Sequence, residues 1–387
     1  MIKTMTAFTF EVDDPAVAAA EITGQINMRS LRKSSLGILT CYTDFIDSGV
    51  VRAVCAALPF DVIGITTGGT AVPGAAGELM FGLMVLTSDD VDFVTGTAPI
   101  GDKKNIDGPI RRACREAWAK HPGAPALMIP FVPYINDLSG EVIALSLDKA
   151  AEGVPLFGSL AIDSSADYSL NRTIYNGEPG DNRVVFALLY GDVHPSFFVS
   201  SVSEDKIQKQ RGVITKSKEN ILMEVNNMPV LDYLQSIGIH RSGGAWAVSL
   251  FPFVINYNDG TKPVVRSLYL LTKEGYAACG GNMPENATLS VGSIDYADIV
   301  RTTSETLNDI LKKQNSGGSC LLMFSCLTRY FALEAHASAE MDTIQNTLAD
   351  SLDYIFSYSG GEICPAYIEN GSLVNRFYNC TFIACLL

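Results

Sequence analysis

A glycine-rich segment at the end of a predicted strand is the first place where this sequence could do chemistry. Thr66, Thr67, Gly68 and Gly69 stand at the end of the apolar run that begins at residue 61. Glycine lets a ligand approach the main chain closely, so the N–H groups of such a loop can bind an anion. Ligands of α/β proteins commonly bind at strand ends. We therefore expect these four residues to contact a ligand; the alternative is a tight turn between two strands.

The second candidate set combines an arginine, two carboxylates and an amide. Arg329 is suited to hold a carboxylate through two parallel hydrogen bonds. Glu362 follows Gly361 after an otherwise uncharged strand, and it could accept a ligand ammonium, as could Asp163. We expect Arg329 and Glu362 to clamp a zwitterion, with Asn379 lining the same pocket. The alternatives are a buried salt bridge that meets no ligand and an amide that bonds only loop backbone.

Cysteine could supply a nucleophile, either at Cys326 or at Cys41, its counterpart in an earlier unit. Arg329, three residues after Cys326, could lower the pKa of that thiol. No cysteine, however, has the nucleophile–base spacing with any of the four histidines, which are His121, His194, His240 and His336. Buried structural cysteine is therefore the preferred interpretation, and a cysteine-dependent enzyme is the alternative.

Sequence motifs for cofactors and metals are missing. The chain contains no Rossmann or Walker fingerprint, no zinc-protease motif and no nucleophile elbow. Cys380 and Cys385 are five residues apart in a predicted strand and so face opposite sides of it. We therefore expect neither a cofactor nor a metal.

The candidate residues fall on an element pattern that recurs three times. Residues 36–93 read as strand, helix, strand, loop and strand, since short apolar runs bounded by turns are typical of buried strands. The same order recurs in residues 124–204 and again from residue 319 to the C-terminal end. Gly64 and Gly158 occupy matching mid-strand positions. This favours duplication of one β-α-β-β unit, although such units also resemble one another by composition.

The segment between the second and third units has a different character. Four apolar stretches separated by turn residues predict antiparallel strands over 251–258, 264–271, 276–280 and 286–291. We place a domain boundary here, giving an N-terminal domain over residues 1–228 and a C-terminal domain over residues 229–387. The expected fold class is mixed α/β (α+β), with mixed sheets flanked by helices.

Composition limits the partners. The chain has 387 residues, and 28 Lys and Arg against 42 Asp and Glu give a net charge of −14. Such a field disfavours nucleic acid and anionic lipid. No apolar run approaches the roughly 18 residues that cross a bilayer, and the first residues lack the apolar core of a signal peptide. The nine scattered cysteines favour a reducing compartment, so we expect a cytoplasmic protein without membrane insertion.

These segments resemble the FIST family, whose members carry an N-terminal and a C-terminal FIST domain. In the N-terminal part the resemblance lies in residues 36–44, 62–71, 154–163 and 183–191. In the C-terminal part it lies in Arg266, in the run 326–329, in residues 359–365 and in Asn379 with Thr381. The chain differs from the family pattern at Thr70, Thr328 and Glu334.

The resemblance implies a sensory protein that binds a small ligand, with amino acids proposed, and passes that signal to another module. We therefore expect a small-molecule binding protein, for an amino acid or related metabolite, that acts in signal transduction through a partner. The alternatives are the cysteine-dependent enzyme and a scaffold that binds a protein without a small ligand. The residues expected to bind the ligand are Thr66, Thr67, Gly68, Gly69, Asp163, Arg266, Cys326, Arg329, Gly361, Glu362 and Asn379.

Overall fold

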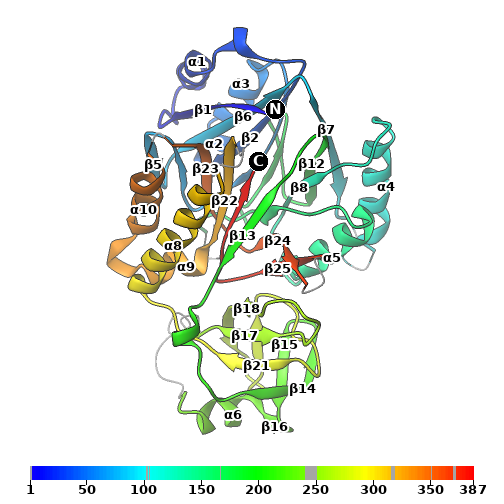
Figure 1. Cartoon of the computed structure of the whole chain (residues 1–387), viewed down its shortest axis with the longest axis vertical. Helices are drawn as coiled ribbons and strands as arrows, with labels where there is room; N and C mark the ends of the chain where they lie inside the picture. Colours follow the sequence, from blue (N-terminus) through cyan, green and yellow to red (C-terminus); the bar gives the residue numbers. More distant parts are fainter. Residues whose placement is uncertain are drawn as a thin grey trace.

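Three six-stranded sheets form the upper body of the molecule, and a smaller β lobe lies below them (Figure 1). The computed structural model describes residues 2–101, 103, 105–165, 167–239, 251–314, 319–349, 351–368 and 372–387. We call residues 212–291 the lower lobe and the rest of the described chain the upper body. The mixed α/β fold class expected from the sequence is confirmed.

The three sheets share one strand order. The first sheet runs β1 (Lys3–Thr9), β6 (Phe81–Ser88), β2 (Ser34–Cys41), β3 (Asp61–Thr66), β10 (Thr173–Tyr175) and β11 (Glu178–Gly180). The second runs β7 (Val91–Pro99), β12 (Arg183–Gly191), β8 (Leu127–Val132), β9 (Gly158–Leu160), β24 (Glu362–Tyr367) and β25 (Leu373–Tyr378). The third runs β13 (Ser196–Ser200), β26 (Phe382–Leu386), β22 (Cys320–Cys326), β23 (Asp353–Ser359), β4 (Thr70–Val72) and β5 (Ala75–Gly77).

Each sheet is built around one parallel strand pair and one antiparallel return strand. β2 and β3 are parallel, and β6 returns on the other side of β2. The same holds for β8 and β9 with β12, and for β22 and β23 with β26. Cys41 is the last residue of β2 and pairs with Thr66 of β3. Cys326 is the last residue of β22 and pairs with Ser359 of β23. The two cysteines thus occupy equivalent positions in two sheets.

Each unit donates a hairpin to a neighbouring sheet, and the exchange is cyclic. β4 and β5 extend the third sheet beside β23, β10 and β11 extend the first beside β3, and β24 and β25 extend the second beside β9. Strands from before and after residue 228 therefore share two of the three sheets. We conclude that the upper body holds both halves of the sequence in one interlocked structure.

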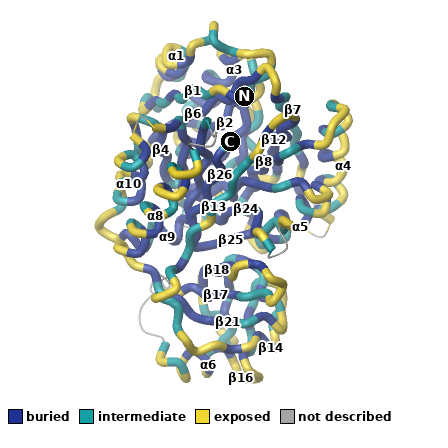
Figure 2. Tube along the Cα trace, viewed as in Figure 1, coloured by how far each residue is buried: buried dark blue, intermediate teal, exposed yellow. Residues whose placement is uncertain are grey.

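A pair of helices covers the outer face of each sheet, and the inner faces meet in one apolar core. The pairs are α1 (Pro15–Gln25) with α3 (Val50–Ala56), α4 (Asp107–Trp118) with α5 (Gly140–Ala151), and α8 (Tyr296–Gln314) with α10 (Ala339–Leu348). Ile38, Ile129 and Phe324, one from each sheet, belong to the central core. Figure 2 shows that the strands in the middle of the upper body are largely buried. Burial on both faces explains why β6, β8 and β22 are apolar without alternation. The short helices are α2 (Asp44–Asp47) and α9 (Leu327–Ala332).

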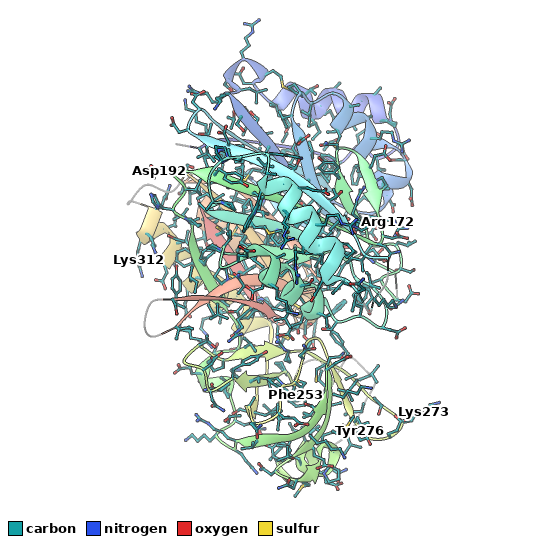
Figure 3. The ribbon with its side chains drawn as sticks, turned by 90° about the vertical axis from the view of Figure 1, so that its right-hand side faces the viewer. Arg172, Asp192, Phe253, Lys273, Tyr276 and Lys312 are labelled. Atoms are coloured by element: carbon teal, nitrogen blue, oxygen red, sulfur yellow. The ribbon has the colours of Figure 1, made fainter. Side chains whose placement is uncertain are left out.

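The lower lobe is a closed antiparallel barrel. Its strands are β14 (Gly212–Lys218), β15 (Ile221–Val225), β17 (Phe253–Asn256), β18 (Val264–Arg266), β19 (Leu268–Leu271), β20 (Ala277–Cys279) and β21 (Thr288–Val291). β18 and β19 are consecutive parts of one bent segment. β18 pairs with β17 at one end of the strand order and β19 pairs with β20 at the other, so this segment closes the ring. β16 (Met228–Pro229) and α6 (Val230–Ser236) lie between β15 and β17 in sequence, so position 228/229 falls inside the lobe. Figure 3 labels Phe253, Lys273 and Tyr276 in this lobe and Arg172 and Asp192 above it.

Gly158 and Gly64 lie where a strand approaches the main chain of its parallel partner. A Cβ on Gly158 would lie 1.8 Å from the Pro130 carbonyl oxygen, and one on Gly64 would lie 2.4 Å from that of Leu39. We expect Gly158→Ala to lower the free energy of unfolding, measured in urea, by about 1–3 kcal/mol. Gly24→Ala in α1 is the matched control: a Cβ there meets no atom within 4 Å, so helix propensity should make it stabilising. Equal changes in the free energy of unfolding for Gly158→Ala and Gly24→Ala would contradict the close approach of β9 to the Pro130 carbonyl.

Candidate functional site

A pocket of about 290 Å³ opens at the strand ends of the second and third sheets, against the lower lobe. Four aromatic residues form much of its wall, namely Tyr134, Tyr168, Tyr269 and Phe331. The remaining wall consists of Ile162, Leu270, Cys326, Leu327, Thr328 and Gly360. The contributors are the segments that follow β8 and β9, the end of β22, helix α9, the turn after β23, and β19 of the lobe. The rule that ligands bind where strands end predicts this position.

The pocket wall is apolar and aromatic, with a few hydroxyl and thiol groups. Among the described residues that line it, none is Lys, Arg or His. The Cys326 thiol donates to Thr328 Oγ1 at 3.6 Å, and that hydroxyl lies 2.9 Å from Ser267 Oγ. Such a wall suits an apolar or aromatic ligand, with hydrogen bonds at a small number of points.

The glycine-rich loop after β3 packs against the third sheet. Thr67 Oγ1 donates to the carbonyl oxygens of Tyr358 at 2.6 Å and Gly69 at 2.9 Å. The N–H groups of Thr66, Thr67 and Gly69 all donate to protein acceptors. A Cβ on Gly68 would meet Leu327, which lines the pocket, at 3.2 Å. The loop is therefore a connection between sheets that supports the pocket from behind, as in the tight-turn alternative.

Arg329 does not form the expected clamp with Glu362. Its Nη2 and Nε donate to Glu340 Oε1 of α10 at 2.7 and 3.1 Å, and Nη2 also donates to Thr303 Oγ1 at 2.8 Å. Only 1% of Arg329 is exposed, and Glu340 is fully buried. The guanidinium is thus used inside the protein, and the zwitterion clamp is corrected to a structural ion pair.

Two buried polar side chains adjacent to wall residues of the pocket have atoms without hydrogen-bond partners among the described residues. Asp163, 2% exposed, accepts a hydrogen bond from the Ser165 N–H at Oδ1, but its Oδ2 has no partner in the part of the chain that the structure describes. Both amide atoms of Asn379 are likewise unpartnered there. A Cβ on Gly280 would lie 2.4 Å from Asn379 Oδ1 and 2.8 Å from the Tyr269 hydroxyl, so these groups are close together. Buried polar atoms without partners are rare and point to a missing ligand or water.

Comparison with known domains settles the family. Residues 35–228 match the FIST N domain, and residues 231–365 match the FIST C domain. The chain belongs to the FIST family. FIST domains are proposed to be small-ligand sensory domains of signalling proteins. The resemblance drawn from the sequence is thereby confirmed.

Other comparisons add little to this FIST assignment. No relative was found among curated proteins. Among solved structures, one described as "Cyanuric acid hydrolase: evolutionary innovation by structural concatenation" is similar at 11% identity and a TM-score of 0.30, over 76% of this chain and 99% of that one. Nothing about this FIST protein is inferred from so low a score.

The cysteines of this FIST protein lack the surroundings of a nucleophile. Burial, and then the neighbouring Glu362, raises the pKa of the Cys326 thiol well above its usual value, and burial does the same for Cys41. Three of the histidines contact other groups: His121 meets Asp92, His194 meets Asp192, and His336 packs on Tyr296. His240 lies outside the described residues. A nucleophilic role for Cys326 has no support in this geometry.

We expect Cys326 to resist alkylation in the native protein. A thiol with a raised pKa forms little thiolate, so iodoacetamide at about pH 8 should label native protein at least about tenfold more slowly than urea-unfolded protein. Mass spectrometry of tryptic peptides reports the labelling of each cysteine. Rapid native labelling at Cys326 that disappears in Cys326→Ser would contradict the structural assignment.

Glu362 is a buried carboxyl in the FIST C part of the chain, held by hydroxyl groups. Ser359 Oγ and Thr381 Oγ1 donate to its two oxygens at 2.8 and 2.6 Å. Burial outweighs these hydrogen bonds and raises the pKa of Glu362 to about 8. The carboxyl is then mostly neutral at pH 7, and it is a poor partner for the ligand ammonium that we expected it to bind.

This raised pKa predicts a pH dependence of stability. The folded-state pKa of Glu362 lies above the ordinary value of 4.5, so its contribution to stability is complete below 4.5 and is lost as pH rises to about 8. Glu362→Gln cannot titrate, and its free energy of unfolding should therefore fall less than that of the wild type between about pH 5 and about pH 8. Urea denaturation at both pH values measures the difference. Identical pH slopes would show that Glu362 is ionised in the folded protein.

Arg266 joins the lower lobe to the second sheet. Its Nη2 donates to Glu141 Oε1 at 2.9 Å and to the Tyr257 hydroxyl at 2.7 Å, and Nη1 donates to the Phe377 carbonyl at 2.7 Å. Glu141 lies in the first turn of α5, and Arg266 is fully buried. Arg266 does not line the pocket, so its place in the structure differs from the ligand-binding role implied by the resemblance.

The aromatic wall of the pocket is the part of the site that the sequence did not reveal. Tyr134 and Tyr168 follow β8 and β9, so a search for aromatic residues after each predicted strand could have found them. Tyr269 comes from the lower lobe, and no local signal ties it to residues of the sheets.

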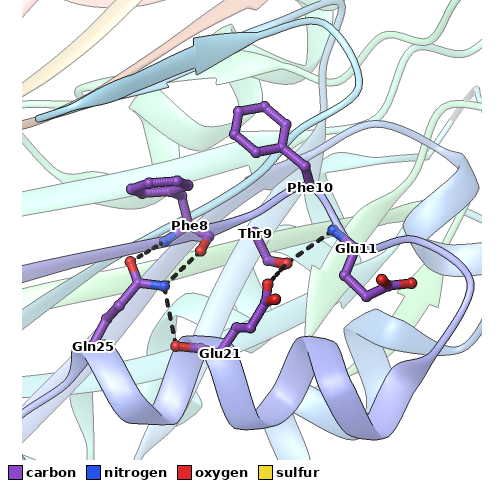
Figure 4. A pocket seen from close by; sticks show the side chains of 6 residues that line it. All are labelled: Phe8, Thr9, Phe10, Glu11, Glu21 and Gln25. Atoms are coloured by element: carbon purple, nitrogen blue, oxygen red, sulfur yellow. Dashed lines mark hydrogen bonds between the residues drawn. The ribbon is translucent and has the colours of Figure 1, made fainter.

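A second groove lies between β1 and α1 at the far end of the upper body (Figure 4). Its volume is about 500 Å³, and Phe8, Thr9, Phe10, Glu11, Glu21 and Gln25 line it. The polar groups of the groove are hydrogen-bonded to one another: the Gln25 amide accepts from the Phe8 N–H and donates to the Phe8 carbonyl, and Thr9 donates to Glu21. With these partners satisfied, the groove is a weaker candidate than the pocket.

Two further properties of the described residues bear on partners. They contain no helix that is long and apolar enough to cross a membrane. Within the same residues, no group of three or more His, Cys, Asp or Glu side chains is placed to hold a metal ion.

Proposed function

We propose that this FIST protein is a cytoplasmic sensor that binds a small molecule in the aromatic pocket and acts in signal transduction through a partner. One observation carries the proposal. The pocket has apolar and aromatic walls, and two nearby residues have polar atoms without partners in the described part of the chain: Asp163, which follows the wall residue Ile162, and Asn379, which lies close to the Tyr269 hydroxyl. Pockets of this composition, with few convergent polar groups, are typical of small-molecule sites.

An amino acid or a related metabolite is the ligand class we propose. The rings of Tyr134, Tyr168 and Phe331 would contact its apolar part. Arg329 cannot bind the carboxylate of such a ligand, because its guanidinium is buried and paired with Glu340. A ligand carboxylate would therefore face the mouth of the pocket and water, where it need not be desolvated.

The construction of the pocket suggests how its occupancy could be transmitted. Tyr269 and Leu270 belong to the lower lobe, whereas the other wall residues belong to the upper body. A ligand that contacts both parts stabilises the arrangement in which they are together, because binding favours the conformation with the better contacts. A partner that reads the position of the lobe would then respond to the ligand.

A thermal-shift screen of amino acids and related metabolites tests the proposal. A saturating ligand, at about 100-fold its dissociation constant, should stabilise the protein by about 2.7 kcal/mol. Leu270→Trp should abolish the shift, because Leu270 is 48% exposed at the pocket and a larger side chain would fill the opening. Leu79→Trp, at a position 43% exposed and outside the pocket, is the matched control. Shifts that survive in Leu270→Trp, or no shift with any compound, would contradict the proposal.

A further inference from the structure

A β-bulge in the lower lobe places two consecutive side chains on the wall of the pocket. The register of β19 on β20 shifts between Leu268 and Leu270, so Tyr269 is an extra residue without a partner in β20. Consecutive side chains of a regular strand point to opposite faces. Tyr269 and Leu270 nevertheless both line the pocket, and they are 41% and 48% exposed, whereas Leu268 is buried. A bulge bends its strand and re-aims the side chains there, which accounts for this paired presentation.

The residues just before the bulge are fixed to the upper body. Ser267 Oγ lies 2.9 Å from the hydroxyl of Thr328, which belongs to the pocket wall. Arg266 donates to Glu141 of α5 at 2.9 Å. These two anchors stand two and three residues before Tyr269 in the sequence. The place of the Tyr269 ring at the pocket is therefore set by contacts within the protein, before any ligand binds.

Tyr269 adds an aromatic ring from the lobe to three rings of the upper body. The rings of Tyr134 and Tyr168 lie 5.3 Å apart between centroids at an interplanar angle of 72°, so they form a corner. Phe331 of α9 supplies the third of these rings. Aromatic rings attract one another in stacked and edge-to-face arrangements beyond the effect of the area they bury. A planar ring in this space can stack on one wall while its edge meets another.

The described residues of the wall carry no charge. A charged group of a ligand would lose its hydration there without gaining a counter-charge, which is costly. The part of the ligand that enters the pocket is therefore uncharged, and any charged group of the ligand stays at the mouth.

From this arrangement we infer that the pocket selects a planar, uncharged aromatic group, and that Tyr269 is a specificity-determining residue for it. The inference rests on the proposed function and narrows its ligand class to aromatic amino acids and aromatic metabolites. A saturated ring of the same size fills the same space but lacks the ring–ring contacts, so it binds more weakly.

Ligand-observed NMR titration with two matched pairs of probes tests the selectivity. One pair is L-phenylalanine and L-cyclohexylalanine, and the other is 2-phenylethanol and 2-cyclohexylethanol, so that only the ring differs within a pair. The aromatic member of a pair should bind the wild type at least about fivefold more tightly than the saturated member. The hydrophobic effect alone would give the opposite order, because the saturated ring is the more apolar of the two.

Three variants test the part played by Tyr269. Tyr269→Leu removes the ring and should reduce the ratio of the two affinities at least about threefold, whereas Tyr269→Phe keeps the ring and should keep the ratio. Tyr367→Leu is the matched control, since Tyr367 is 51% exposed and is not among the residues that line the pocket. If Tyr269→Leu weakens both members of a pair equally, the residue has only a structural role and its assignment to selectivity is overturned.

The outcomes separate this inference from the proposed function. If the amino-acid pair does not bind while the alcohol pair shows the aromatic preference, the inference is supported and the proposed amino-acid class is wrong. If the saturated members bind as tightly as the aromatic ones, and Leu270→Trp abolishes that binding, the inference is overturned while the pocket remains a ligand site. If none of the four probes binds, the inference is also overturned, and the metabolite screen decides the proposed function separately.

Discussion

Arg329→Met should lower the free energy of unfolding by about 3–5 kcal/mol, because it leaves the carboxylate of Glu340 buried without a counter-charge. Glu340 is fully buried, and its oxygens also accept hydrogen bonds from Thr303 and Ser325. These hydroxyl groups cannot replace the charge of the guanidinium. Urea denaturation of the full chain measures the loss.

Two further variants show whether this loss comes from the ion pair. Arg329→Met combined with Glu340→Leu should recover part of the stability, since an apolar pair of similar volume can replace a buried ion pair. Arg301→Met removes an arginine that is 42% exposed and pairs with the exposed Asp205 and with Asp298; because the buried Asp298 keeps Lys206 as a partner, the substitution should cost at most about 1 kcal/mol. If Arg329 instead held a ligand carboxylate, Arg329→Met would abolish binding and spare stability, which would contradict the structural assignment.

Arg266→Met should produce a second loss of about 3–5 kcal/mol and should also weaken ligand binding. The substitution leaves Glu141, which is 6% exposed, without its cation, and it removes the donors to Tyr257 and to the Phe377 carbonyl. Arg266 ends β18, and Tyr269 and Leu270 of the pocket lie in β19, just beyond Ser267. Loss of the ion pair should therefore loosen the lobe against the pocket.

The variants at Arg266 are compared by urea denaturation and by titration with whichever ligand the screen identifies. Arg266→Lys keeps the charge but not the fork of donors, so its losses should lie between those of the wild type and of Arg266→Met. A full loss of stability in Arg266→Met with unchanged ligand affinity would show that the lobe takes no part in binding.

The sequence was sufficient to predict the fold class and the family, because both depend on local patterns. The unbroken apolar runs at β8 and β22 indicate strands that are buried on both faces, and they lie in the core. Matches to both FIST domains confirm the resemblance. The exchange of hairpins could not be predicted, since β4 and β10 have only three residues each and their partners are distant in the sequence.

The place of the pocket in the fold follows from the sequence, but of the residues expected to bind the ligand, Cys326 alone is among the described residues that line it. Strand ends were expected to hold the ligand, and the pocket lies at the ends of β8, β9, β22 and β23. Arg329 was assigned the wrong partner, because Glu340 belongs to α10 and nothing in the local sequence marks it as buried. Asp163 was chosen as an acceptor for an ammonium, and that role is still a prediction.

A crystal structure of the full chain with a compound from the thermal-shift screen tests the central claim most directly. We expect electron density for the compound in van der Waals contact with Tyr168, Tyr269 and Phe331. Density elsewhere, for example in the groove between β1 and α1 or beside Arg266, with the aromatic pocket empty, would contradict the account.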